Sequence, residues 1–225
     1  MRKFNLLKDY PTPDSPRVVS VDSRTIENRI IASYKDKEFY DGDRNNGFGG
    51  FYYDGRWNVV AQKIIKEYEL KDEAKILQMG SDKGFLLRDI KEINKTFEIY
   101  GLEYSKYAIE NSENIVKSKI IYSENFITDF NDSYFNFVIA LGVVYTQNIK
   151  GAISIIKEIE RLSNGKSFIT LASYQTKIDF DLFKDWTLLG TLILKEEEWE
   201  NVLKHCGYTG DYYFTNAQSL NLIRK

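Results

Sequence analysis

The feature of this sequence that most constrains its fold is a regular alternation between residues 74 and 174. Short apolar runs, expected to form strands, alternate there with segments of helical periodicity. The expected strands are 74–79, 97–104, 119–122, the start of 135–145 and 166–174, and the expected helices are 84–94, 105–117 and 149–163. Continuous apolar strands joined by helices are typical of a mostly parallel sheet covered on both faces. The alternation therefore predicts an α/β fold.

The two ends of the chain depart from this alternation. The three prolines, Pro11, Pro13 and Pro16, predict an extended arm over residues 1–23. A single domain is expected over 24–225, beginning with a helical and lid segment at 24–70 that holds helices at 24–38 and 57–69. A late helix is expected at 195–206, and two strands at 208–215 and 220–224. The connection between these strands is too short for a parallel crossover, so we expect a hairpin and one antiparallel strand.

Composition excludes several classes of protein. The 31 basic and 33 acidic residues give a formal net charge of -2, which argues against a nucleic-acid partner. One His and one Cys exclude an internal disulfide and a zinc site built from those residue types. No run approaches the roughly 20 apolar residues of a membrane span, and the N-terminus has no apolar run of signal-peptide length. A cytoplasmic protein without a metal or a membrane insertion is expected.

A glycine turn and an acidic residue occupy the places where such folds bind nucleoside cofactors. Gly80 and Gly84 flank the turn after the first expected strand, and Glu103 ends the next strand, 19 residues after Gly84. About 20 residues separate a phosphate-binding turn from the acid that binds a ribose. Asp82 occupies the middle-glycine position and would repel a pyrophosphate, which argues against NAD or FAD. A cofactor without phosphates, such as S-adenosylmethionine, fits better.

Four segments carry a resemblance to a known family. AKILQMGSDKGFLL, IYGLEYSKYAIENS, FNFVIALGVVY and AISIIKEIERL together resemble class I S-adenosylmethionine-dependent methyltransferases. The flanking segments 38–57 and 197–214 are similar to small bacterial methyltransferases encoded among surface-polysaccharide and capsule genes. The resemblance implies a Rossmann-like sheet of seven strands, mostly parallel with one antiparallel strand. It also implies S-adenosylmethionine as the cofactor and S-adenosylhomocysteine as the product.

The resemblance assigns roles to individual residues. The methionine part of the cofactor would be lined by Gly80, Ser81, Asp82 and Gly84. The ribose would be held by Glu103. The adenine would be contacted by Tyr104, Glu124 and Asn125. Ala140 and Leu141 would contact the amino-acid moiety, and a lid over the donor methyl would contain Tyr53, Asp54, Arg56 and Trp57. Trp186 would line the acceptor pocket or pack in the core.

The sequence also departs from the family pattern. Gln78 stands where the first strand usually ends in an acid, and Tyr145 stands where relatives commonly carry a histidine. The general base for a small polar acceptor is therefore Tyr145 or Asp54, unless the acceptor is an anion or an amine that needs no strong base. The leading hypothesis is methylation of a sugar or phosphate-type group in surface-polysaccharide or capsule biosynthesis. Alternatives are a catalytically degenerate binding or regulatory partner and a nucleotide-sugar or NAD-dependent enzyme. A homo-oligomer or a companion methyltransferase is a possible assembly.

Overall fold

The computed structural model describes residues 1–20 and 23–225 and is built on one eight-stranded sheet. Along the sheet the strands follow the order β1 (Arg2–Lys3), β9 (Asp211–Thr215), β7 (Ser167–Tyr174), β6 (Phe137–Ala140), β3 (Lys75–Met79), β4 (Glu98–Glu103) and β5 (Ile120–Tyr122). β8 (Leu194–Lys195) pairs with β7 outside this path. The predicted α/β fold with a Rossmann-like sheet is confirmed.

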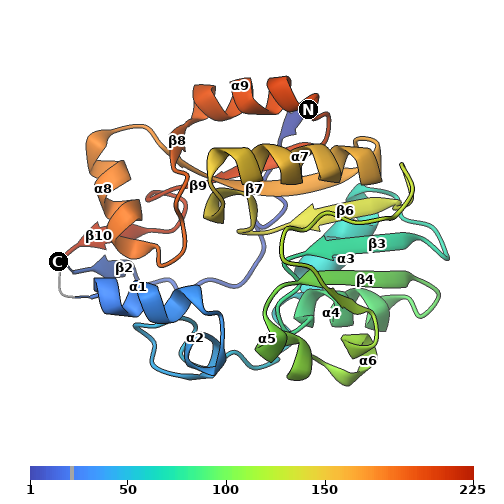
Figure 1. The fold of residues 1–225 in the computed structure, drawn as a ribbon, viewed down its shortest axis with the longest axis horizontal. Coiled ribbons are helices and arrows are strands. Elements are labelled where there is room, and N and C mark those ends of the chain that lie inside the picture. The colour runs from blue at the N-terminus through green and yellow to red at the C-terminus, as the bar shows by residue number, and fades with distance from the viewer. Residues whose placement is uncertain (21–22) are drawn as a thin grey trace.

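Helices cover both faces of the sheet (Figure 1). On one face α7 (Ile149–Ser163) and α9 (Glu196–Cys206) pack on a core that includes Leu77 and Met79 of β3. On the other face α3 (Asn58–Glu67) and α4 (Phe85–Ile93) pack against Ile76 of the same strand. Alternate residues of β3 therefore enter opposite cores, as the pleat of a strand buried on both faces requires.

The expected hairpin and antiparallel strand are wrong. Every strand pair between described residues is parallel. After β9, mutual hydrogen bonds between Asn216 and Ser219 form a turn that leads the chain away from the sheet. β10 (Leu222–Arg224) then pairs with β2 (Arg17–Val19) in a separate two-stranded sheet. A short connection does not force two strands to pair when a distant segment supplies an edge.

Two expected helices are each divided in two. The segment expected to be a helix at 24–38 forms α1 (Ile26–Ser33) and α2 (Lys37–Asp41), separated by Lys35 with φ of 45° and by Asp36, whose side chain caps α2. The segment at 105–117 forms α5 (Lys106–Glu110) and α6 (Asn114–Lys117). A one-turn helix, η1 (Val144–Thr146), follows β6, and α8 (Lys177–Trp186) follows β7.

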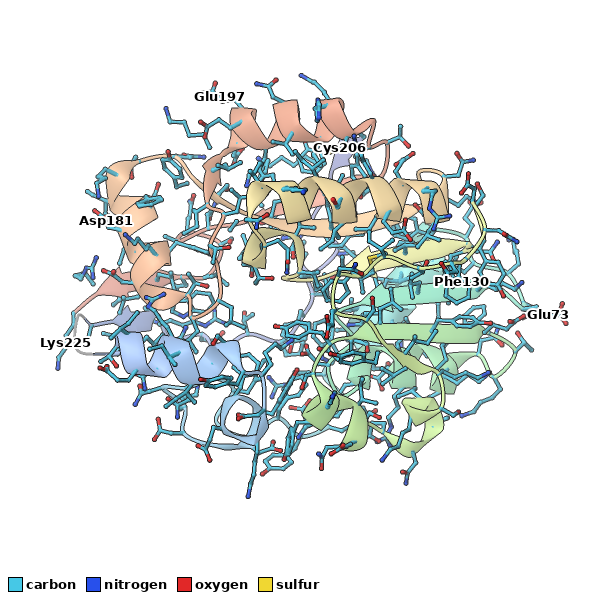
Figure 2. All side chains as sticks on the ribbon, in the orientation of Figure 1. Glu73, Phe130, Asp181, Glu197, Cys206 and Lys225 are labelled. Carbon is cyan, nitrogen blue, oxygen red and sulfur yellow. The ribbon has the colours of Figure 1, made fainter. Side chains whose placement is uncertain are left out.

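The carboxyl ends of the central strands face α1 and α2. Figure 2 labels Glu73, which precedes β3, at the edge of the molecule farthest from these two helices. The chain therefore enters β3 at that edge and leaves it toward α1 and α2. In open parallel sheets ligands bind beyond the carboxyl ends of the strands, so α1 and α2 lie where they can cover such a site.

Candidate functional site

A cavity of about 310 Å³ lies at the carboxyl ends of β3, β4 and β6. The strand ends contribute Gly80, Asp82, Tyr104 and the segment 141–143. The cover consists of the α1–α2 region, the loop that follows α2, and residues 186–190, which comprise the end of α8 and the segment after it. This volume is at the lower end of the range for small-molecule sites.

Glu103 organises the floor of this cavity from the end of β4. Its side chain is 0% exposed, and its carboxylate accepts hydrogen bonds from the backbone N–H groups of Asp82 at 2.8 Å, Tyr104 at 3.0 Å and Ser105 at 2.9 Å. Burial raises the pKa of Glu103, although the Lys35 ammonium opposes this effect. The carboxylate therefore joins the turn after β3 to the end of β4.

The turn after β3 brings the backbone close to the cavity. Gly80 has φ of 70°, and a Cβ on it would lie 2.4 Å from Cγ2 of Val143. A larger residue would collide with the β6 side of the cavity and would also be strained. Asp82 adopts φ of 48° although it is not glycine, so this position has kept the backbone conformation that a glycine normally provides.

Lys35 neutralises the Asp82 carboxylate, and Tyr40 holds it with a hydrogen bond. The Lys35 ammonium lies 3.1 Å from Asp82 Oδ1 and 3.6 Å from Glu103 Oε1, and the Tyr40 hydroxyl donates to Asp82 Oδ1 at 2.7 Å. Burial alone would lower the pKa of Lys35, but the carboxylates of Asp82 and Glu103 outweigh it and raise this pKa. The negative charge introduced at the middle-glycine position is therefore balanced by a residue of the α1–α2 connection.

A second buried ion pair fixes the turn to α2. The Lys83 ammonium donates to both carboxylate oxygens of Asp41, at 2.8 and 2.7 Å, and to the carbonyl of Phe51 at 3.0 Å. Asp41 also accepts from the Tyr107 hydroxyl at 2.7 Å and from the Phe51 N–H at 3.0 Å. The loop that covers the cavity is thus tied to the turn through one carboxylate.

Six of the residues singled out in the sequence line the cavity: Gly80, Asp82, Tyr104, Leu141, Tyr145 and Trp186. Ser81, Gly84, Glu103 and Ala140 are buried beside it on the same strand ends. Burial raises the pKa of Tyr145 to about 12, so its phenol stays protonated at neutral pH. Trp186 also packs against Phe183, so it serves both the cavity and the core.

The structure does not bring the remaining predicted residues to this cavity. Asp54 and Arg56 are exposed and pair with each other, and Trp57 packs against Tyr10 with ring centroids 4.5 Å apart. Tyr53 is half-buried and donates to Asp89 on α4 at 2.5 Å. Glu124 and Asn125 are exposed and bond to Tyr122 and to the Ile127 N–H.

Several lining residues escaped the sequence analysis. Phe126 is buried, has φ of 60° and packs edge-on to Tyr104 at 6.0 Å, in the region where Glu124 and Asn125 were expected. Lys35, Arg24 and Arg44 also line the cavity. A possible signal was Asp36, because a capping residue in the middle of an expected helix predicts a break there and would have placed Lys35 at a turn.

Within residues 1–20 and 23–225, no group of three or more His, Cys, Asp or Glu side chains is arranged to hold a metal ion. None of the helices in the same ranges combines the length and apolar character needed to cross a bilayer.

Comparison with known proteins finds similarity in structure only. No family model matches the chain, and no curated protein matches its sequence. The structure of a complex between the Haloferax volcanii Trm112 methyltransferase activator and a candidate methyltransferase matches with a TM-score of 0.55 and 15% identity, over 80% of this chain and 76% of that one. A candidate methyltransferase from Bacillus halodurans matches with a TM-score of 0.51 and 13% identity, over 65% and 68%.

A further match shows how far this similarity extends. The [4+2]-cyclase SpnF matches with a TM-score of 0.51 and 13% identity, over 66% of this chain and 57% of that one. Proteins of such low identity share a fold and not necessarily a reaction. The chain therefore has the Rossmann-like fold of the class I methyltransferases.

Proposed function

We propose that this protein is an S-adenosylmethionine-dependent methyltransferase acting on a small polar acceptor, a sugar or phosphate-type group, in surface-polysaccharide or capsule biosynthesis. The observation that carries the proposal is Glu103. It is a buried carboxylate at the carboxyl end of β4, directly before a tyrosine that lines the cavity, and it is bonded to the glycine turn after β3. A carboxylate in that place can accept hydrogen bonds from both hydroxyls of a ribose.

The residues around the turn fit this cofactor. Two buried polar atoms near the turn, Gln78 Oε1 and Ser81 Oγ, have no hydrogen-bond partner among the described residues, but neither side chain lines the cavity. Gly80 lines the cavity with backbone atoms alone, because Val143 occupies the space that a side chain would need. Lys35 lies 4.7 Å from the centroid of the Tyr104 ring and beside Glu103, so its ammonium must shift before a ribose reaches the carboxylate.

The cofactor supplies a methyl group activated by a positive sulfur, so the protein mainly binds, orients and excludes water. Tyr145 lines the cavity with a protonated phenol at neutral pH, which suits it to orient an acceptor by a hydrogen bond. Asp54 is paired with Arg56 outside the cavity lining, so it could contribute only if its loop moved. An acceptor that is already anionic needs no stronger base than this site offers.

Calorimetric titration with S-adenosylhomocysteine tests the proposal first. Micromolar binding supports a working cofactor site despite Gln78 and Asp82. No binding at millimolar ligand would contradict the proposal and favour the alternative, a catalytically degenerate binding or regulatory partner. A nicotinamide cofactor is titrated for comparison, and weaker binding than that of S-adenosylhomocysteine would exclude the NAD-dependent alternative.

Replacing Tyr145 by Phe is expected to lower kcat/KM by about two- to thirteenfold, because one neutral hydrogen bond to the acceptor contributes about 0.5–1.5 kcal/mol. Affinity for S-adenosylhomocysteine should be unchanged. Steady-state kinetics with an active acceptor measure both quantities, and an unchanged kcat/KM would remove Tyr145 from the mechanism.

A companion methyltransferase or a second copy of the chain is part of the same proposal, as is a cytoplasmic location. One structural match is itself a complex with a methyltransferase activator. Helix α1 and the residue at its C-cap carry three exposed apolar side chains at helical spacing, Ile26, Ile30 and Tyr34, and such a stripe is typical of a contact surface. Light scattering of the protein before and after Tyr34→Glu measures the assembly.

A further inference from the structure

One side of the cavity is rich in positive charge. It is formed by residues on either side of α1, by the loop after α2 and by residues 186–190. Arg24 and Arg44 both line it. Neither is paired with a carboxylate in the part of the chain that the structure describes. Asp82 is the one acidic residue among the described lining residues, and it is already held by Lys35. Two guanidinium charges therefore face the cavity without a described acidic partner.

Both arginines keep unused hydrogen-bond donors. Arg24 donates to the carbonyl of Trp186 and lies 4.9 Å from the centroid of that ring. Arg44 donates to the carbonyls of Gly47 at 2.6 Å and Phe48 at 3.2 Å. A guanidinium has five N–H donors, so the described contacts leave most of them available.

Two more arginines lie close enough to act on this pair. Burial lowers the pKa of Arg24 to about 10, with further lowering by the charges of Arg44, Arg29 and Arg17. The pKa of Arg17 is lowered as well, mainly by burial and secondly by repulsion from the charge of Arg44. Arg29 donates to the carbonyls of Thr187 and Lys184 near the end of α8, so its position is structural. An anion in the cavity would relieve the mutual repulsion of this cluster.

We propose that Arg24 and Arg44 bind a phosphoryl group carried by the methyl acceptor. The inference rests on the proposed function, and it narrows the acceptor to a phosphorylated small molecule. A guanidinium matches phosphate oxygens with paired donors, and a doubly charged phosphate balances two arginines where a single carboxylate would not. Hydrogen bonds to such charged groups are about twice as strong as neutral ones, so they can fix the orientation of the acceptor.

Calorimetric titration with inorganic phosphate at constant ionic strength tests the site, with acetate as a monovalent comparison. The wild-type protein is expected to bind phosphate at least tenfold more tightly than acetate. Arg24→Gln and Arg44→Gln are each expected to weaken phosphate binding at least tenfold. Arg44→Lys keeps the charge but lacks the paired donors, so it should fall between the wild type and Arg44→Gln. Arg88→Gln removes an arginine that pairs with Glu113 outside the cavity, and it should leave phosphate affinity unchanged.

The same variants are titrated with S-adenosylhomocysteine to separate the two proposals. Unchanged S-adenosylhomocysteine binding with lost phosphate binding supports the anion site. Phosphate binding that is equal in the wild type and both glutamine variants, or no stronger than acetate binding, overturns it. If S-adenosylhomocysteine fails to bind while phosphate binding still depends on the arginines, the proposed function fails and the anion site stands. Should Arg24→Gln fail to fold, as judged by thermal unfolding, Arg44→Gln decides the question.

Discussion

Replacing Glu103 by Gln is expected to weaken S-adenosylhomocysteine binding about 10- to 100-fold. A hydrogen bond from a ribose hydroxyl to a carboxylate contributes about 1.5–3 kcal/mol, and of the two amide atoms of Gln only the oxygen can accept a hydroxyl, so one of the two bonds is lost. The substitution also removes one of the two carboxylates that surround Lys35, and it leaves at least one of the backbone N–H groups of Asp82, Tyr104 and Ser105 without an acceptor. Calorimetry at pH 7 measures the affinity, and thermal unfolding confirms that the variant is folded.

The matched control lies on the same strand. Glu98 begins β4, its side chain is exposed, and it accepts one hydrogen bond from Tyr100. Glu98→Gln makes the same chemical change 5 residues away and should alter neither the affinity nor the melting temperature. If Glu103→Gln binds S-adenosylhomocysteine within threefold of the wild type, Glu103 does not hold a ribose and the proposed cofactor site must be abandoned.

Local sequence patterns predicted most of the central elements. The helix expected at 149–163 is α7, and the strands expected at 74–79 and 166–174 are β3 and β7 to within one residue. These elements combine strong periodicity with burial, so their own residues determine their form. The pairing of β10 depends instead on Arg17–Val19, which form its neighbouring strand and come from the other end of the chain. Spacing between neighbouring segments contains no information about that distant partner.

The sequence likewise predicted one half of the candidate site and missed the other half. Its strand-end half, with Gly80, Asp82 and Glu103, follows from the order of strand, turn and helix, because the topology of a parallel sheet fixes where those residues meet. The covering half depends on tertiary packing. Arg24 and Lys35 sit on either side of α1, both with positive φ, and neither differs by sequence pattern from the other basic residues of the chain. Only the packed structure shows that both line the cavity.

Replacing Lys83 by Met is expected to lower the free energy of unfolding by about 1.5–3 kcal/mol, because it leaves the half-buried Asp41 carboxylate without its cation. The Lys83 side chain is 6% exposed and that of Asp41 is 13% exposed, so water replaces little of the lost interaction. The loop after α2, which carries Arg44, should loosen as well, since Asp41 also binds Phe51. Urea unfolding at pH 7 measures the loss, and Lys119→Met, at an exposed position, is the control.

The pH dependence of this loss identifies the ion pair as its cause. Burial alone would raise the pKa of Asp41, but hydrogen bonds from Lys83, Tyr107 and the Phe51 N–H outweigh it and lower that pKa. A lowered pKa in the folded state stabilises the protein above the unfolded value of about 3.9, and this contribution disappears as the pH falls through the folded value. The wild type and Lys83→Met should therefore differ fully at pH 7 and converge below about pH 4.

A second substitution separates the buried charge from simple loss of packing. In the double variant Lys83→Met, Asp41→Asn, the amide oxygen can still accept from the Phe51 N–H, and no uncompensated charge stays buried. We expect this variant to be about 1–2 kcal/mol more stable at pH 7 than Lys83→Met alone. If it is less stable, the Lys83 side chain acts mainly through packing, and the connection between the 80–84 turn and the covering loop does not depend on charge.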